Sequence, residues 1–263
     1  MKISVIIPVF NRERYIGSAL RSLLRQRDAA ELDIIVIDDG STDGTAGVVH
    51  QIMAEAPCIR YASQANMGVA KARNAGLKLL LPETELVTFL DSDDISPQGR
   101  FAAELTFFEA DPSLDFTYGL MTIVDRIDEA ALHAPADCEG ITVRGISLTT
   151  AIFRRSTIES LDGFDEQFSQ AEDLDFLLRL FERRPRYVLS DIVAIFYRRH
   201  DGNMTNEQGQ TRREFLKALL RSAQRRRRDP SLGDVPPIFD LKNLTDPRIA
   251  SSRPIVEQTN SPQ

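Results

Sequence analysis

The sequence predicts an α/β protein built around a mostly parallel sheet, and two observations support this. Strand-like and helix-like patterns alternate from residue 3 to residue 90, an order typical of parallel strands joined by right-handed crossovers. Acidic residues also gather directly after two of the strand-like runs, at 38–39 and 91–94. Because open α/β sheets bind ligands at the carboxyl ends of their strands, the pattern indicates a site at that edge of the sheet.

The first part of the chain contains four predicted strands and three predicted helices. Three strands are short apolar runs rich in β-branched residues, at 3–7, 33–37 and 86–90, and 58–62 suggests a further one. The helices have apolar residues at helical spacing, at 14–26, from a cap at Thr42 or Asp43 to about Ala56, and at 68–80.

Beyond residue 94 the alternation is less regular, which predicts a smaller, mixed region. The expected helices are 99–110 and 174–182, and the expected strands are 116–124, 188–196 and a return to the sheet within 146–153. We expect 129–140 to be a loop over the site and 212–228 to be a basic amphipathic helix. From Asp229 onward Pro, Asn and Ser recur with few apolar clusters, which predicts an extended or disordered tail.

The composition is that of a soluble globular enzyme and argues against two other classes. Hydrophobic residues make up 42% of the 263-residue chain, charged residues 27%, and the formal net charge is −7. An acidic body argues against general nucleic-acid binding. No apolar run approaches the length of a membrane span, no signal-peptide pattern is present, and Cys58 and Cys138 lack metal-type spacing. We therefore expect a reduced, cytoplasmic protein.

Asp91-Ser92-Asp93-Asp94 is the most informative stretch of the chain. It places three carboxylates at the end of the predicted buried strand 86–90. Mutual repulsion makes such packing costly unless a cation or polar ligand compensates it. The stretch therefore indicates a divalent metal held by oxygen ligands, Mg²⁺ or Mn²⁺, with a solvated acidic turn as the alternative.

Four stretches, taken in this order and spacing, resemble the family 2 glycosyltransferases with the GT-A fold. They are Ser-Val-Ile-Ile-Pro-Val-Phe-Asn at 4–11, Ile-Asp-Asp-Gly-Ser-Thr-Asp-Gly-Thr at 37–45, Asn-Met-Gly-Val-Ala-Lys-Ala-Arg-Asn-Ala-Gly at 66–76 and Leu-Asp-Ser-Asp-Asp at 90–94. The resemblance covers roughly residues 1–205.

This resemblance implies a Rossmann-like, mostly parallel sheet flanked by helices, with a smaller mixed sheet on the acceptor side. It divides residues 1–210 into a nucleotide-binding half, 1–95, and an acceptor-side half, 96–210. The basic helix, 211–228, and the tail, 229–263, then follow that domain.

On the donor side, the residues and the resemblance point to the same positions. A carboxylate makes a strong hydrogen bond to the imide N–H of a base, and the family pattern assigns Asp39 to uracil, although Asp39 could instead cap a turn. Pro8 and Val9 would form the turn where the backbone approaches the base. By resemblance, Arg73 contacts the nucleotide, and Asp91 contacts the ribose or a metal-bound water.

The expected metal ligands are Asp93 and His200. The family's DxD-type motif matches Asp91-Ser92-Asp93, so Asp93 would coordinate an Mn²⁺ or Mg²⁺ ion that bridges the two phosphates. His200 follows a predicted strand, where some members of the family place a metal ligand or diphosphate contact; a packed or surface histidine is the alternative. Asp94 could be a helix cap.

The resemblance also identifies the general base. Gly163-Phe164-Asp165-Glu166 and Ala171-Glu172-Asp173-Leu174-Asp175-Phe176 match the family's acceptor-side pattern, in which Asp173 deprotonates the acceptor hydroxyl. Burial and the neighbouring Glu172 would raise the pKa of Asp173 toward the working pH. Simple charge pairing at a helix N-terminus is the alternative.

The basic helix ends in Arg225–Arg228, and three explanations stay open for it. Segment 212–228 holds eight basic residues and one acidic residue. It could contact an anionic membrane surface, complement the acidic body of a second subunit, or remain solvated.

Together these features predict a metal-dependent, inverting, hexosyltransferase-type enzyme that moves a single sugar from a nucleotide-sugar donor, expected to be a UDP-sugar, to an acceptor hydroxyl. The acceptor would be a saccharide or a lipid-linked molecule in glycan or cell-envelope polysaccharide synthesis, with the enzyme cytoplasmic or peripheral at the inner face of the membrane. The alternatives are a sugar nucleotidyltransferase, a non-catalytic sugar-nucleotide or partner-binding module, and a receiver-like phosphoacceptor domain. No Gln-x-x-Arg-Trp element is present, which argues against a processive synthase.

Overall fold

The first part of the chain folds as the predicted alternation of parallel strands and helices. The structure, a computed structural model, describes residues 1–138, 140–203 and 208–237. Strands β1 (Lys2–Val9), β2 (Glu31–Asp38), β3 (Ile59–Ser63) and β4 (Leu86–Phe89) run parallel to one another. Helices α1 (Ile16–Leu24), α2 (Thr45–Met53) and α3 (Val69–Lys78) connect them.

The second part continues the same sheet with mixed strand directions. It contains α4 (Arg100–Ala110), β5 (Phe116–Val124), β6 (Ile141–Val143), β7 (Ala151–Arg154), α5 (Arg155–Glu159), α6 (Glu172–Glu182), β8 (Tyr187–Arg198) and α7 (Gln208–Arg228). Strand β7 is antiparallel to both β4 and β5, β6 is antiparallel to β5, and β8 is parallel to β5. The eight strands run in the order β3-β2-β1-β4-β7-β5-β6, with β8 also paired to β5. This mostly parallel sheet with a mixed acceptor-side region confirms the predicted fold class.

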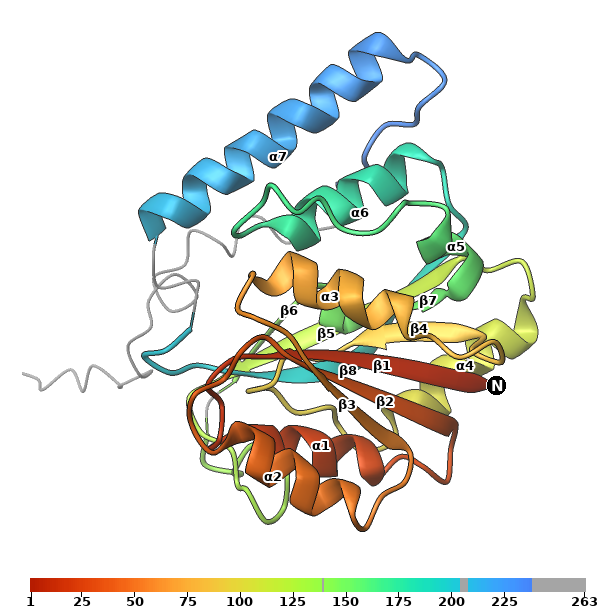
Figure 1. Cartoon of the computed structure of the whole chain (residues 1–263). Coiled ribbons are helices and arrows are strands. Elements are labelled where there is room, and N and C mark those ends of the chain that lie inside the picture. Colours follow the sequence, from red (N-terminus) through yellow and green to blue (C-terminus); the bar gives the residue numbers. More distant parts are fainter. Residues whose placement is uncertain (139, 204–207, 238–263) are drawn as a thin grey trace, which may run out of the picture.

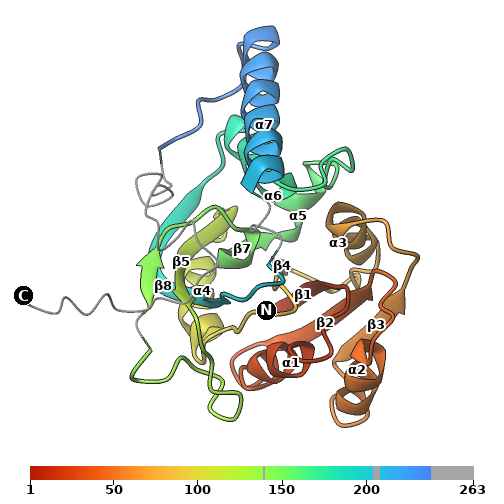
Figure 2. The same ribbon diagram turned by 90° about the vertical axis from the view of Figure 1, so that its left-hand side faces the viewer.

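Helices cover both faces of the sheet, as Figures 1 and 2 show. In β1, Ile3, Val5 and Ile7 pack with α1, α2 and α4, whereas Ile6 packs on the other face with α3 and α6. Burial on both faces explains why the strand is a continuous apolar run. Gly76 allows α3 to approach β1 closely, because a Cβ there would lie 2.5 Å from Ile6 Cγ2.

Some boundaries differ from the sequence prediction. The 146–153 segment forms a 3₁₀ turn, Leu148–Thr150, before β7 begins, and neither β6 nor α5 was predicted. The expected cap of α2 at Thr42 or Asp43 is wrong, since Gly44 is the N-cap residue. Asp43 instead accepts hydrogen bonds from the amide and hydroxyl of Thr45. The 129–140 segment holds turns and one isolated bridge, Asp128 to His133, over its described residues.

Helix α7 lies outside these layers, against α6 (Figures 1 and 2). It begins about one turn earlier than predicted, at Gln208. Among the helices in the described part of the chain, none is long and apolar enough to cross a membrane. The expected tail from residue 229 is described only as far as 237, and the rest of that segment lies outside the described residues.

Candidate active site

The predicted donor-side residues lie at one edge of the sheet, where β1, β2 and β4 end. The strand register places Val9 beside Asp38 and Ile6 beside Phe89, so the segments after these strands leave the sheet side by side. Pro8 and Val9 are buried and are the last two residues of β1. Val9 O accepts a hydrogen bond of 2.8 Å from Asp39 N. The chain then turns at Asn11, whose φ of 52° is in the left-handed region.

Asp39 is buried and its carboxylate is used to hold the start of α3. Oδ1 accepts from Met67 N at 2.9 Å and Gln64 Nε2 at 2.8 Å, and Oδ2 accepts from Gly68 N at 2.7 Å. Gly68 has a φ of 92°, a conformation that favours glycine. The neighbouring Asp38 accepts from Ser41 N and Tyr61 Oη, both at 2.7 Å, so it fixes the turn after β2.

Arg73 connects the two sides of the site. It is buried at 4% exposure, and its Nη2 donates to Asp91 Oδ1 at 3.0 Å while its Nη1 donates to Glu172 Oε1. The guanidinium carbon also lies 5.9 Å from the ring centre of Phe89 and 5.7 Å from that of Phe164. Arg73 therefore links the end of β4 to the first turn of α6.

Asp93 and His200, the two predicted metal ligands, lie in contact. His200 Nε2 is 2.9 Å from Asp93 Oδ2, and Gly202 N donates to His200 Nδ1 at 3.1 Å. Because Nδ1 accepts that bond, the geometry assigns the imidazole proton to Nε2, where it faces the carboxylate. The ring of Tyr15 stacks on His200 with ring centres 4.8 Å apart.

Arg12 completes this cluster, and the sequence prediction missed it. Its Nε donates to Asp93 Oδ2 at 3.0 Å and its Nη2 donates to Gly202 O at 3.0 Å. Burial would raise the pKa of Asp93, but the hydrogen bond from His200 and the charge of Arg12 outweigh it and lower that pKa. The only sequence signal for Arg12 was its place directly after the Pro-Val-Phe-Asn turn.

The cluster offers a suitable set of atoms for a divalent ion. Within the described residues no three His, Cys, Asp or Glu side chains gather as a metal site. Mg²⁺ in nucleotide sites, however, commonly takes one or two carboxylates together with substrate phosphates. Asp93 and His200 supply the carboxylate and the imidazole that suit Mn²⁺. To hold such an ion, His200 would have to carry its proton on Nδ1 and give up the hydrogen bond from Gly202 N, and Arg12 would have to turn away from Asp93 Oδ2.

Asp94 has a structural position in the acidic stretch. It is 1% exposed, and its Oδ1 accepts from Arg198 N at 2.9 Å. Burial, with Asp93 and Asp91 nearby, raises the pKa of Asp94 well above its ordinary value. Arg198 also donates from Nε to Asp93 O at 2.9 Å and from Nη1 to Glu129. It therefore fixes the backbone of the acidic stretch.

Asp173 occupies the first turn of α6, directly after Glu172, which Arg73 contacts. It is half-buried, and the described contact of its carboxylate is a 2.7 Å hydrogen bond from Leu174 N. Burial first, and then the neighbouring Glu172, raise the pKa of Asp173 to about 7. A carboxyl group with that pKa is protonated or ionised with nearly equal ease at neutral pH, as a general base requires.

The loop before α6 is held by Asn74, another residue that the sequence prediction did not single out. Asn74 Oδ1 accepts from Phe164 N at 2.8 Å, and its Nδ2 donates to Phe164 O at 3.0 Å and Glu166 Oε1 at 3.1 Å. Helix α3 therefore carries both Arg73 and the anchor for the 163–166 loop.

These contacts form one continuous path across the site. It runs from His200 through Asp93 and the β4 end to Asp91, Arg73 and Glu172, next to Asp173. Asp39, Pro8 and Val9 lie at the neighbouring strand ends, joined to this path through α3.

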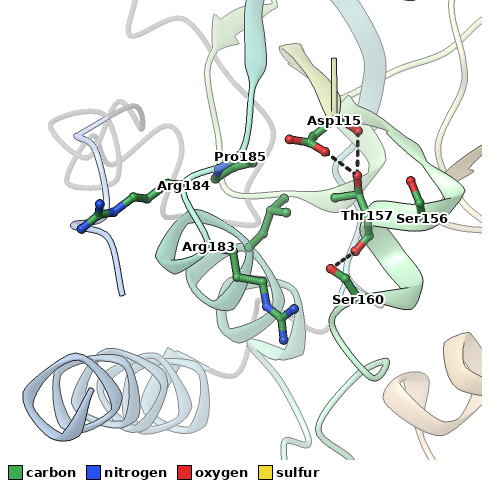
Figure 3. A pocket seen from close by; sticks show the side chains of 8 residues that line it. Asp115, Ser156, Thr157, Ser160, Arg183, Arg184 and Pro185 are labelled. Atoms are coloured by element: carbon green, nitrogen blue, oxygen red, sulfur yellow. Dashed lines mark hydrogen bonds between the residues drawn. The ribbon is translucent and has the colours of Figure 1, made fainter. Parts of the chain in front are cut away.

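A separate polar pocket of about 240 Å³ lies elsewhere (Figure 3). It is lined by Asp115, Ser156, Thr157, Ser160, Leu180, Arg183, Arg184 and Pro185. Thr157 Oγ1 donates to Asp115 Oδ1 at 3.0 Å within it. Arg155 N binds Glu85 O, just before β4 begins, so this pocket is at the opposite end of β4 from Asp91.

Known proteins resemble this chain in sequence or in structure. The chain is 30% identical to the chondroitin synthase of Escherichia coli over 187 residues, which are 70% of this chain and 27% of that protein. The chain thus spans only about a quarter of that relative's length. S. aureus TarS 1–349, solved in complex with UDP-GlcNAc, matches with a TM-score of 0.65 and 25% identity over 85% of this chain and 66% of that one.

The mannosyltransferase PcManGT from Pyrobaculum calidifontis, solved in complex with GDP-Man and Mn²⁺, shares the fold. Its TM-score is 0.64 at 20% identity, over 95% of this chain and 72% of that one. A sequence profile of the family described as "Glycosyl transferase family 2" matches residues 4–163. Because this match covers more than half of the chain, the chain belongs to glycosyl transferase family 2.

Proposed function

We propose that this protein is a metal-dependent, inverting glycosyltransferase that moves one sugar from a UDP-sugar to an acceptor hydroxyl. The observation that carries the proposal is the path of contacts from His200 and Asp93 to Asp91, Arg73 and Glu172, which joins the acidic cluster after β4 to Asp173, a carboxylate whose pKa is raised to about 7. The similarity to TarS, which binds UDP-GlcNAc in its crystal structure, supports a uridine nucleotide as the donor.

The donor would lie across the ends of β1, β2 and β4. Asp39 would accept the imide N–H of the base, while the backbone of Pro8 and Val9 borders the base. Asp91 would contact the ribose. The guanidinium group of Arg73 would exchange part of its contact with Asp91 for a contact with the nucleotide. Since Asp39 is already held in place by protein contacts, it needs little reorganisation to bind.

Asp93 and His200 would hold the Mn²⁺ or Mg²⁺ ion beside the diphosphate. When bound, such an ion neutralises the charge that develops on the departing diphosphate. Arg12 lies against the same carboxylate oxygen, so it adds positive charge on that side of the site.

Asp173 would take the proton of the acceptor hydroxyl. The acceptor oxygen then forms a bond to the anomeric carbon as the bond from that carbon to the diphosphate oxygen breaks, and the electron pair leaves with the nucleoside diphosphate. Attack from the face opposite the leaving group inverts the anomeric centre. The proton stays on Asp173 until solvent removes it.

The acceptor would be a saccharide or a lipid-linked molecule, in glycan or cell-envelope polysaccharide synthesis. The similarity to chondroitin synthase supports a polysaccharide pathway. The outer face of α7 exposes Leu216, Leu219 and Leu220 between arginines at both of its ends, which suits an anionic membrane surface. We propose that a cytoplasmic enzyme docks there peripherally; a homodimer through the same face is the alternative. Sedimentation with vesicles containing phosphatidylserine, compared with ultracentrifugation without lipid, separates the two.

The donor assignment is tested by a thermal-shift screen of nucleotide sugars with and without Mn²⁺ or Mg²⁺. We expect at least one UDP-sugar to raise the melting temperature only in the presence of metal. Hits are then assayed for release of UDP. If no nucleoside diphosphate or nucleotide sugar gives metal-dependent stabilisation, the proposed donor site is wrong.

A further inference from the structure

The inner face of α7 is bonded to the loop that leads into Asp173. Arg221 pairs with Asp165, and its Nη2 donates to Gln167 Oε1 at 2.6 Å. Lys217 Nζ donates to Gln167 O at 2.7 Å. The ring centre of Phe168 lies 4.4 Å from Lys217 Nζ and 4.9 Å from the guanidinium carbon of Arg221. The basic side chains of α7 therefore hold this loop in place.

The next residues of this loop are held in the same way. Gln210 Nε2 donates to Ser169 Oγ at 3.0 Å, and Thr211 Oγ1 donates to Gln170 Oε1 at 2.5 Å. Ala218, fully buried, packs into an apolar cluster with Phe168, Ala171, Leu174 and Leu178. Contacts from one face of α7 thus follow the loop up to the residue that precedes Glu172.

Ala171 links these contacts of α7 to the candidate base, Asp173. It is the N-cap residue of α6, with φ 61° and ψ 21°, a left-handed conformation that is unfavourable for a residue with a side chain. Such a conformation persists only when its surroundings determine it, and its methyl group is buried in the cluster with Ala218. Asp173 lies two residues later, in the turn that this conformation starts.

Helix α6 is also fixed from α7 beyond this turn. Arg225 donates from Nε and Nη2 to the two carboxylate oxygens of Glu182, at 2.7 and 3.0 Å, and from Nη1 to Asp175 Oδ1 at 3.1 Å. The side chains of Asp175 and Glu182 are only 2% exposed. Arg225 is therefore a counter-ion for buried carboxylates, unlike Arg227 and Arg228, which are exposed on the same helix.

We propose that α7 is a positioning element for Asp173, because it clamps the 163–171 loop and the strained turn at Ala171. This inference rests on the proposed role of Asp173 as the base. Arg221 and Lys217 are positioning residues in this view and do not touch the substrate. The clamp sets the place of the Asp173 carboxylate, and none of the clamp contacts described above involves Asp39, Pro8 or Val9 at the strand ends.

The test compares Lys217→Ala/Arg221→Ala with Arg227→Ala/Arg228→Ala, which removes the same charge from the exposed end of the same helix; all assays are done without lipid, so that the proposed membrane contact of this end plays no part. In the first variant we expect amide hydrogens of 163–175 to exchange at least about tenfold faster. UDP release from the UDP-sugar found by thermal shift should fall about tenfold in kcat, with KM within twofold. The acid limb of its pH profile should move below 7. The second variant should match the parent in all three measurements.

A second matched pair guards against a failure to fold. Ala218→Leu overfills the contact with α6, whereas Ala223→Leu adds the same side chain on the exposed face of α7. We expect only Ala218→Leu to speed exchange in the loop and to lower kcat. Arg221→Lys, made as a single change, should lose less of the kcat than Arg221→Ala.

Unchanged exchange in 163–175 for both disruptive variants would overturn the clamp. Faster exchange with kcat and pH profile unchanged would overturn it too, as long as Asp173→Asn abolishes UDP release. If Asp173→Asn itself retains full UDP release, the base assignment of the proposed function fails, and loop exchange alone then decides whether α7 holds the turn.

Discussion

Asp39 after β2 and Asp173 at the start of α6 are both carboxylates beside the candidate site, but the protein surrounds them differently. Asp39 is 4% exposed and accepts hydrogen bonds from Gln64, Met67 and Gly68. Asp173 is half-buried, and its described hydrogen bond comes from the adjacent Leu174 N. One carboxylate is fixed by donors, while the other keeps an oxygen for a ligand.

This difference separates a group suited to binding from one suited to proton transfer. Three N–H donors hold the Asp39 carboxylate in place. A carboxyl group with few donors, close to Glu172, has its pKa raised to about 7 and can exchange a proton at neutral pH. The surroundings of Asp39 therefore suit rigid binding of a ligand, and those of Asp173 suit proton transfer.

The strongest way to break this comparison is Asp173→Asn. We expect UDP release to fall by about 1,000-fold, because the amide cannot take the acceptor proton, while donor binding changes less than about twofold. UDP release at saturating donor and calorimetric titration of UDP measure the two quantities. Asp162→Asn, the same change at an exposed residue of the segment between α5 and α6, is the control. Equal losses of binding and turnover would mean that Asp173 belongs to the receptor side.

Asp93→Ala should give the next largest effect, on the donor side. Removing the carboxylate that contacts His200 and Arg12 should weaken metal-dependent UDP binding by about 100-fold, since it removes an expected metal ligand. Titration of UDP with and without Mn²⁺ measures this. Metal dependence that survives in the variant would place the ion elsewhere.

The pH profile sharpens the comparison without a mutation. The pKa of Asp173 is raised to about 7, first by burial and then by Glu172, so its basic form predominates above that pH. UDP release should rise about tenfold per pH unit up to pH 7 and then level off, giving a loss of about 30-fold at pH 5.5. A limb centred near pH 4 would contradict the raised pKa.

The same shift predicts how stability depends on pH. A carboxyl group with a folded-state pKa above its unfolded value opposes folding as pH rises through that range. Asp173→Asn should therefore unfold at the same or a higher urea concentration than the parent at pH 8, even though it has lost activity.

Asp39→Asn should have the smallest effect. Its new NH₂ group would face one of the N–H donors of Gln64, Met67 or Gly68, which should lower the free energy of unfolding by about 1–3 kcal/mol. Affinity for UDP should fall about tenfold. Urea unfolding and calorimetry measure both, with exposed Asp28→Asn as the control. An effect on turnover larger than that on UDP affinity would assign Asp39 to the chemistry.

The regular elements of the fold were readable from the sequence, and the irregular ones were not. Strands such as 116–124 are long enough to show their pattern, and β5 has those bounds. Strand β6 has three residues and α5 has five, too few to show a period. The predicted cap of α2 was wrong because Asp43 accepts the hydrogen bond of Thr45 N from one residue before the N-cap, Gly44. Residue type alone does not reveal that difference.

The site shows the same division. Local motifs marked Asp39, Asp93 and Asp173, because each stands at the end of a strand or the start of a helix. Arg12 and Arg225 were missed or left open, because their roles come from residues far away in sequence, 81 positions away for Asp93 and 43 for Glu182. A single chain without its fold does not bring such partners together.

Strand β4 is four residues long, fully buried, and pairs with β1 on one side and β7 on the other. A chain cut between residues 95 and 96 would therefore give a first fragment with an unpaired apolar edge, which we expect to aggregate. Insertions should be tolerated better beyond the outer strand β3 or after α7 than between the halves. Longer proteins built on this unit would accordingly grow by addition at its periphery, with the middle of the sheet kept intact.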